Sequence, residues 1–346
     1  MTALPAVDSL DARRADHAAR VGIVRELLDR RGSPGALLTS RRNFAWLTAG
    51  GANHVVLETE TGAAAILVSR DTVTVLAPNI EADRLRDEEV AGLGIEVVPL
   101  PWWQPEAIDA EARRRAGGQP AGDGDLERQL VGDRSRLSEL DHERLAWLGD
   151  VAAAAADGVL AGVAGGMTED HLGDSLLGRL DGTRVPVLLI AADDRIVRYR
   201  HPLPGSTPIR HRVMLVLVAE RWGLHVALTR FRELERSDAE LARRWDAVRH
   251  VQAALHDATR PGATLGDVFE AGRRAYAEVG FPDEWQLHHQ GGTIGYQGRE
   301  RIAVPDDPTP IEADMAFAWN PSITGTKAEE TFVLARGDQR IVTTTR

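Results

Sequence analysis

Several histidines and one pair of carboxylates in the second half of the chain stand in short polar stretches that could do chemistry. The stretch RYRHPLPG contains His201, LHHQGGTIG contains His288 and His289, and KAEETFVL contains Glu329. A neutral imidazole can take a proton from water and return it to a departing nitrogen near pH 7. A carboxylate can hold a cationic group or orient a water molecule. These side chains are therefore the candidates for acid–base chemistry.

Composition excludes several other kinds of chemistry and partner. The 346 residues include no cysteine, which rules out disulfides, thiolate metal ligands and a cysteine nucleophile, and is typical of a cytoplasmic protein. The net charge of -11, with no dense Lys/Arg block, argues against nucleic acid as a partner. No apolar run reaches about 18 residues, so we expect no membrane span.

The residues that position these side chains fall into two expected domains. Residues 1–135 begin with a helix and continue with short β-rich runs and helical pieces, which predicts a smaller mixed α/β domain. Residues 136–346 begin with an Ala/Leu-rich helix, followed by three strands, two helices and four more strands, the first of them around WQLHH. This order predicts an antiparallel sheet with helices on one side, so the whole chain is of the α+β class.

The order of these elements and their local wording resemble the creatinase/aminopeptidase P superfamily, whose C-terminal domain has the pita-bread fold with a curved antiparallel sheet. Peptidases of this superfamily bind two metal ions through two Asp, one His and two Glu residues. Four segments resemble the motifs that carry these ligands: RVMLVLVAERWGLHVALTRF, GGTIG, AFAWNP and KAEETFVL. The resemblance places at the five ligand positions Val216, Ala227, Gly292, Asn320 and Glu329.

Four of the five expected ligands are thus absent. A single carboxylate with an amide cannot supply the charge and coordination number that divalent metals need in such a site. We therefore expect no dinuclear metal centre and no cofactor. A different metal site stays open, and its candidates are His225, His288, His289, Glu220 and Glu330.

Creatinase, a member of the same superfamily, hydrolyses a guanidinium-type C–N bond without metal, and this chain resembles it further. Its second Asp position is an Ala, as at Ala227 here, and it has a GRE sequence like the one ending at Glu300. Its catalytic His lies where RYRHPLPG puts His201. The resemblance implies that His201 is the acid/base, and that Glu329 holds a cationic substrate group or orients the attacking water. The alternative is that His201 only binds substrate or caps a turn.

Five side chains are predicted to bind the substrate: His225, His289, Asn320, Arg42 and Trp319. Strand alternation puts His225 on the same face as Ala227, although a buried, hydrogen-bonded role is equally open. Alternation sends only one of His288 and His289 inward, and we favour His289. The same rule turns Glu330 away from the face of Glu329.

The other predicted contacts follow from side-chain chemistry. The amide of Asn320 can donate and accept hydrogen bonds. Arg42 lies in a segment that resembles the superfamily's first strand and suits a substrate carboxylate, unless it belongs to an exposed basic turn. Trp319 could form an aromatic wall for a cation, or it could lie in the core. Gly291 and Gly292 are expected to enlarge the cavity by removing side-chain bulk.

We therefore expect a metal-independent hydrolase that splits a C–N bond of amidine, guanidine or amide type in a small nitrogenous metabolite. The rival hypothesis is a non-catalytic pseudopeptidase that binds a peptide or a small ligand. A third is an Xaa-Pro metallopeptidase, against which the absent ligands argue. The resemblance also implies a homodimer.

Overall fold

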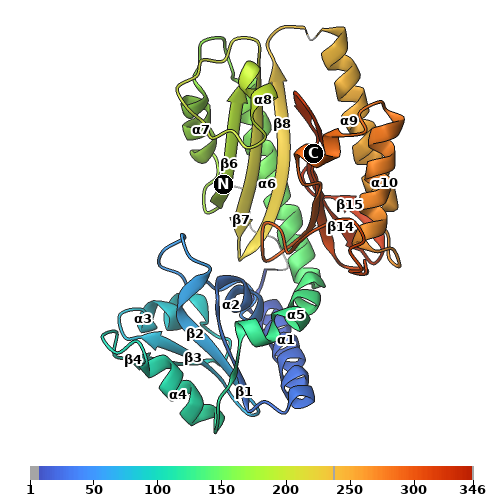
Figure 1. Ribbon diagram of the computed structural model, residues 1–346. Helices are drawn as coiled ribbons and strands as arrows, with labels where there is room; N and C mark the ends of the chain where they lie inside the picture. The colour runs from blue at the N-terminus through green and yellow to red at the C-terminus, as the bar shows by residue number, and fades with distance from the viewer. Residues whose placement is uncertain (1–7, 237, 345–346) are drawn as a thin grey trace. The chain divides into compact units, whose positions relative to one another are not determined.

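The computed structural model describes residues 8–236 and 238–344, which form two compact units (Figure 1). Of the described residues, one unit holds 8–134 together with Trp222–Leu224. The other holds Ser135–Arg221, 225–236 and 238–344. Each unit builds its own sheets and hydrophobic core. Within the described ranges, no helix has the length and apolar character needed to cross a membrane.

The first unit is a five-stranded mixed sheet with helices. Its long helix α1 (Leu10–Arg31) begins at Ser9, whose side chain accepts a hydrogen bond from a backbone N–H of the first turn, and ends at the left-handed Gly32. The strand order is β4-β3-β2-β1-β5. The strands are β1 (Gly35–Ser40), β2 (Thr61–Ser69), β3 (Val73–Pro78), β4 (Glu96–Leu100) and β5 (Ala121–Gly122). The remaining helices are α2 (Arg41–Leu47), α3 (Ala82–Arg84), the π-helix η1 (Leu85–Glu89), α4 (Ala107–Ala116) and α5 (Asp123–Ser135).

The second unit begins with helices and a three-stranded sheet. A capping box of Ser138 and Asp141 starts α6 (Glu139–Ala161), and Thr168 caps α7 (Glu169–Leu177). The sheet has the order β6-β7-β8, with β6 and β7 antiparallel. Its strands are β6 (Arg184–Ala192), β7 (Arg212–Arg221) and β8 (Leu224–Glu233), and the short helix α8 (Asp194–Arg198) follows β6.

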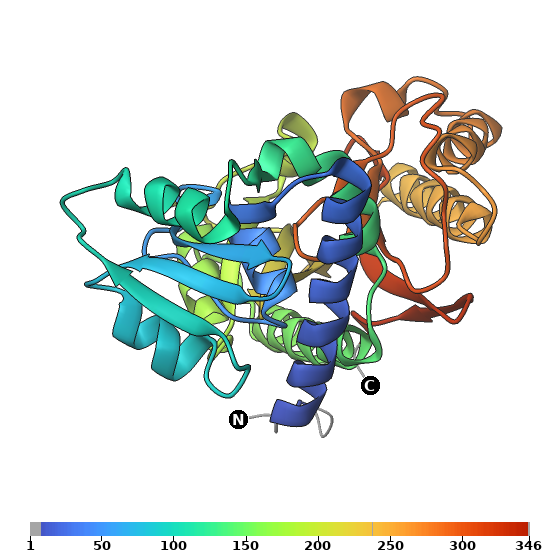
Figure 2. The ribbon, with the colours of Figure 1, turned by 90° about the horizontal axis from the view of Figure 1, so that it is seen from below.

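A second sheet, antiparallel in the order β10-β9-β11-β14-β15, completes this unit. Its strands are β9 (Gly291–Ile294), β10 (Arg301–Ile302), β11 (Ala316–Trp319), β14 (Glu330–Ala335) and β15 (Asp338–Ile341), with a separate hairpin of β12 (Ser322–Ile323) and β13 (Thr326–Lys327). The helices α9 (Ala239–Ala258) and α10 (Leu265–Glu278) lie side by side (Figure 2). Phe317, Trp319 and Phe332 pack against them in a hydrophobic core of this unit, so one face of the sheet is apolar.

One predicted strand is wrong. The segment around WQLHH forms a 3₁₀-helix, η2 (Glu284–Leu287), and the chain becomes extended only at His288. Tertiary hydrogen bonds explain the difference. Glu284 accepts hydrogen bonds from the backbone and hydroxyl of Thr324, and its carboxylate is ion-paired with Arg200. These contacts hold a turn of helix in place that no local hydrophobic period signals.

Candidate functional site

Three histidines from two distant segments gather in the second unit. His201 lies in the loop after α8, and His288 and His289 follow η2. The Nε2 atoms of His201 and His288 are 3.0 Å apart. The rings of His288 and His289 stack with 4.5 Å between centroids, and those of His201 and His289 are 6.0 Å apart. The exposed His201 thus rests on the buried His288.

Both His288 and His289 approach His201, so the prediction that only one of them turns toward the site is wrong. Strand alternation does not apply to them, because residues 288–290 precede β9 and belong to no strand. The extended conformation of His288 after the helical turn instead brings the two rings into a stack. His288 is therefore a site residue that the sequence pattern assigned to the wrong face.

All three imidazoles favour the neutral form. Burial, together with the charge of Lys327, lowers the pKa of His288 to about 3. Burial and the charges of Arg299 and Lys327 lower the pKa of His289 to about 4. Burial and Lys327 also lower the pKa of His201, against the opposing charge of Glu329. A neutral imidazole can accept a proton, which an acid/base residue must do first.

The buried carboxylate of Glu329 lies between two cations. Its Oε1 is 2.7 Å from Nη2 of Arg299, and its Oε2 is 3.0 Å from Nζ of Lys327. The hydroxyl of Thr229 donates to Oε2 over 2.7 Å. Burial alone would raise the pKa of Glu329, but these two charges and the hydrogen bonds overcome it and lower the pKa to about 2. Burial lowers the pKa of Lys327, which Glu329 opposes.

This arrangement corrects the predicted role of Glu329. The sequence suggested a carboxylate that was available for a cationic substrate group, yet both of its oxygens are occupied by side chains of the protein. Arg299 and Lys327 carry one positive charge more than the carboxylate balances. The neighbourhood of the histidines is therefore cationic rather than anionic. Glu330 forms its own pair with Arg230 at 2.8 Å, as expected for the opposite face.

The five positions that match metal ligands carry one carboxylate between them. Val216 lies in an apolar cluster with Met214, Leu189 and other residues. The backbone of Ala227 both donates to and accepts from the hydroxyl of Thr331, which joins β8 to β14. Glu329 is paired with two cations. A divalent ion beside these cations would be repelled, and no second carboxylate is present at these positions to offset that.

The two glycines do not enlarge a cavity, contrary to expectation. Gly291 has φ +95°, and a Cβ there would lie 2.1 Å from the carbonyl oxygen of Ala318. Gly292 has φ +154°, and its Cβ would lie 2.1 Å from the carbonyl oxygen of Arg301. Neighbouring backbone thus fills the space. A histidine at Gly292, where the superfamily has a ligand, would require the strands to move apart.

Asn320 stands at the end of β11, beside the histidine segment. Its backbone N–H donates to the carbonyl of Gln290 over 3.0 Å, and its side chain is only 2% exposed. Among the described residues, none donates a hydrogen bond to its Oδ1. A buried acceptor without a donor is costly, so this atom is suited to an N–H group of a ligand.

The other predicted substrate contacts are Trp319, His225 and Arg42. Trp319 is fully buried in the core, where its Nε1 donates to the hydroxyl of Thr259, directly after α9, so the predicted aromatic wall is wrong. Alternation explains this, because Trp319 faces the helices while Asn320 follows on the opposite side. His225 is half-buried with Nδ1 3.2 Å from the carbonyl of Gly295. Arg42 belongs to the first unit and is ion-paired with Glu127 at 3.4 Å.

In the described part of the chain, His201, His288 and His289 form a group whose ligand atoms are close enough together to be considered for a metal ion. The three ligand nitrogens lie within 4.8 Å of one another. Zinc with imidazole bonds of about 2.0–2.1 Å needs nitrogens closer together than that, so the rings would have to move. The charges that lower the pKa of His289 also oppose a dication here.

The metal site that the sequence left open is not formed as a set. Glu220 pairs with Arg184, its Oε1 accepting from Nη2 over 2.6 Å. Glu330 pairs with Arg230, and His225 contacts Gly295. In the described residues these side chains do not gather around the two stacked histidines.

A cavity of about 550 Å³ opens beside the Glu329 ion pairs. Its lining includes Lys327, Glu329 and Thr229 on the strand side, and Trp245 and Arg249 on α9. The rings of Trp245 and Phe231 are nearly perpendicular, with 4.7 Å between their centroids. The space is large enough for a small molecule in contact with the buried pair.

Lys327 and Arg299 are the functional candidates that sequence reasoning missed. Lys327 stands two residues before Glu329, so strand alternation alone could have placed both on one side. Arg299 lies in the GRE sequence, and nothing in the neighbouring residues indicates that it pairs with Glu329, 30 positions away. Both cations change the chemistry that Glu329 can perform.

The chain resembles known proteins in sequence and in structure. The sequence profile of metallopeptidase family M24 matches residues 145–344. A prolidase from Pyrococcus horikoshii OT3 superimposes with a TM-score of 0.77 at 17% identity, over 95% of this chain and 99% of that one. Dipeptidase PepE from Mycobacterium ulcerans gives a TM-score of 0.75 at 19% identity, over 96% and 97%. A search of curated protein sequences finds no significant match.

A domain of a protein that is not named as a peptidase has the same fold. The N-terminal domain of FACT complex subunit SPT16 from chickpea superimposes with a TM-score of 0.72 at 11% identity, over 98% of this chain and 97% of that one. These likenesses confirm the predicted α+β class, with a pita-bread domain after a smaller N-terminal one. At such low identity they establish the fold, and the chemistry must be argued from the residues.

Proposed function

Because the chain belongs to metallopeptidase family M24 but surrounds Glu329 with Lys327 and Arg299, we propose that it is a metal-independent hydrolase. It splits a C–N bond of amidine, guanidine or amide type in a small nitrogenous metabolite. The ion pairs of Glu329 carry the proposal, since they supply fixed positive charge where relatives of this family would need ligands for a cation. The metal ions that the family name implies do not fit these residues.

His201 is the acid/base of the proposed reaction. Its neutral ring takes a proton from water, and the oxygen of that water forms a bond to the substrate carbon. The C–N bond then breaks, and the proton passes from His201 to the departing nitrogen. Water is consumed, so the products are a carbonyl compound and an amine or ammonia. Lys327 and Arg299 favour the negative charge that develops on the oxygen of an amide during attack, and they favour the neutral over the protonated form of an amidine or guanidine.

Substrate binding uses the polar atoms beside the histidines. The unpaired Oδ1 of Asn320 accepts from a substrate N–H, a group that amidines, guanidines and primary or secondary amides all carry. His289, whose ring stacks on that of His288, presents the polar edge of its imidazole to the substrate. Arg42 and His225 remain predicted contacts for other parts of the substrate. We further propose that the protein acts as a cytoplasmic homodimer.

A hydrolysis screen tests this proposal. Chelator-treated protein is incubated with amidines, guanidino acids, amides and dipeptides, and amine or ammonia release is measured. We expect turnover of at least one compound, lost about 100-fold or more in His201→Asn. His211→Asn, which alters an exposed histidine of the same unit, is the matched control and should retain activity. Turnover that requires added metal, or that survives in His201→Asn, would overturn the mechanism.

The second candidate is a non-catalytic module that binds a peptide or a small ligand. The observation that favours it is the carboxylate of Glu329, whose two oxygens both pair with side chains of the protein. The fold shared with the SPT16 domain is compatible with this role. Thermal stabilisation by a ligand that is never converted would support it. Metal-dependent cleavage of Xaa-Pro peptides would instead support the third hypothesis, a metallopeptidase.

A further inference from the structure

The contacts of His288 determine which of its ring nitrogens carries hydrogen. Its Nδ1 lies 2.5 Å from the carbonyl oxygen of His289. A carbonyl oxygen can only accept, so Nδ1 must donate the hydrogen of that bond. A neutral imidazole has one N–H, which leaves a lone pair on Nε2. His288 therefore offers an acceptor to whatever faces its Nε2.

The atom that faces it is Nε2 of His201, at 3.0 Å. Two neutral nitrogens at this distance make a hydrogen bond only if one of them donates. Since Nε2 of His288 is the acceptor, Nε2 of His201 must carry the hydrogen. The lone pair of His201 is then on Nδ1.

We propose that His288 is a positioning residue that fixes the tautomer of His201, so that Nδ1 of His201 is the atom that accepts the proton. This inference deepens the proposed function and rests on it for the identity of the base, although the tautomer itself can be measured without any substrate. His288 touches His201 and not the reacting atoms. Its part is comparable to that of a carboxylate or carbonyl that orients a catalytic imidazole.

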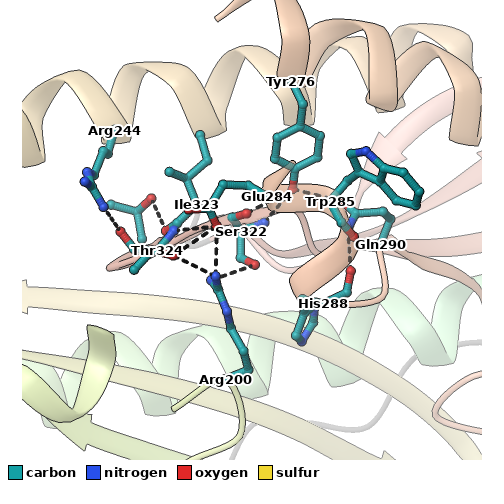
Figure 3. A network of polar contacts seen from close by, with 11 residues as sticks. Arg200, Arg244, Tyr276, Glu284, Trp285, His288, Gln290, Ser322, Ile323 and Thr324 are labelled. Atoms are coloured by element: carbon teal, nitrogen blue, oxygen red, sulfur yellow. Dashed lines mark hydrogen bonds and ion pairs between the residues drawn. The ribbon is translucent and has the colours of Figure 1, made fainter. Parts of the chain in front are cut away.

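The loop of His201 is tied to the segment of His288 by a network of polar contacts (Figure 3). Arg200, directly before His201, donates from Nη2 to the carboxylate of Glu284 and to the hydroxyl of Thr324, both over 2.8 Å. Glu284 begins the short helix that leads to His288. The ion pair of Arg200 and Glu284 therefore joins the two backbone segments that carry His201 and His288. This link limits how far the two imidazole rings can move apart.

A second set of contacts fixes the backbone of His288. Nε2 of Gln290 donates to the carbonyl of His288 over 2.6 Å and to that of Trp285 over 3.2 Å. The hydroxyl of Tyr276 lies 2.9 Å from Oε1 of Gln290 (Figure 3). Tyr276 and Gln290 are both buried, so solvent does not compete for these bonds.

This tautomer has a chemical consequence for the proposed reaction. When Nδ1 of His201 takes a proton from water, the ring becomes an imidazolium with hydrogen on both nitrogens. The Nε2–H stays bonded to the lone pair of His288, which stabilises the new charge without giving up or receiving a proton. The proton then leaves from Nδ1 toward the departing nitrogen, so both transfers use the same atom.

The test is nitrogen NMR of the complete chain labelled with ¹⁵N-histidine, near pH 7 and without substrate. Signals of His201 and His288 are assigned by their loss in His201→Asn and His288→Phe. We expect hydrogen on Nε2 and a bare Nδ1 for His201, with the reverse for His288. Hydrogen on Nδ1 of His201, or an even mixture of its tautomers, would overturn the proposal. Because no turnover is involved, this result is independent of whether the protein hydrolyses anything.

Variants separate positioning from general stability. His288→Phe should leave His201 as a tautomer mixture, and His288→Gln, whose amide oxygen can still accept, should restore the Nε2–H form in part. His289→Phe is the matched control and should preserve the tautomer. With a substrate in hand, His288→Phe should lower kcat about 10- to 100-fold while KM changes little. An unchanged tautomer of His201 in folded His288→Phe would contradict the assignment.

Discussion

Removing the carboxylate of Glu329 should destabilise the second unit more than removing one of its cations. Glu329→Gln leaves Lys327, only 5% exposed, without its counter-ion, while Arg299 loses its partner too. Loss of one partner from a buried ion pair typically costs about 3–5 kcal/mol. In Lys327→Met the carboxylate keeps Arg299, so we expect a smaller loss of about 1–3 kcal/mol. The double variant should be less destabilised than the sum of the two.

The assay is urea unfolding at pH 7, followed by circular dichroism, for the wild type, both single variants and the double variant. The coupling between the two changes should be about 1–3 kcal/mol, as for groups in direct contact. Glu240→Gln is the matched control, because its pairs with Arg243 and Arg244 are at the surface and contribute little to stability. A Glu329→Gln variant as stable as this control would refute the description of Glu329 as a buried, doubly paired carboxylate.

Two further changes test the fold around the site. Burial lowers the pKa of His256 to about 4, so between about pH 6.5 and 4 the unfolded chain binds a proton that the folded one does not. The free energy of unfolding should therefore fall as pH drops through that window, by up to about 1.4 kcal/mol per pH unit. Urea unfolding of His256→Phe at several pH values should show a weaker dependence of this free energy on pH than the wild type. An identical dependence would contradict the lowered pKa of His256. Gly292→Ala should lower the free energy of unfolding by about 2 kcal/mol, because the added Cβ would overlap the carbonyl of Arg301. Gly124→Ala is the control, because there is open space around Gly124, and it should change the melting temperature little. Equal melting temperatures for the two variants would contradict the close backbone contact at Gly292.

Patterns with a fixed period allowed much of the second unit to be predicted. Alternation placed Glu329 and Glu330 on opposite sides of their strand, and their separate ion pairs agree with that. The sequence also predicted two helices after the first three strands of this unit, and α9 and α10 stand there. The period of a strand or a helix is set by residues close together in the sequence, so one sequence is enough to predict these features.

The site itself could be predicted only in part. The resemblance brought His201 into view, but its partner His288 comes from 87 positions away and from a segment without strand periodicity. Arg299 and Lys327 neutralise Glu329 through contacts that only the folded chain makes. The sequence suggests Trp319 as an aromatic wall for a cation, whereas strand geometry turns it into the core. The sequence pointed to Glu329 alone, and the pairing of Glu329 with two cations decides its chemistry.

The most direct test of the central claim is the metal content of the purified protein by plasma mass spectrometry, after exposure to excess zinc, manganese and cobalt and removal of unbound ions. We predict substoichiometric metal in the wild type and no change in Glu329→Gln, because Lys327 and Arg299 already pair with that carboxylate. Stoichiometric metal that is lost in both Glu329→Gln and Asn320→Ala would contradict this prediction, since a metal ion would then be bound at two of the positions that match the ligand positions of the superfamily.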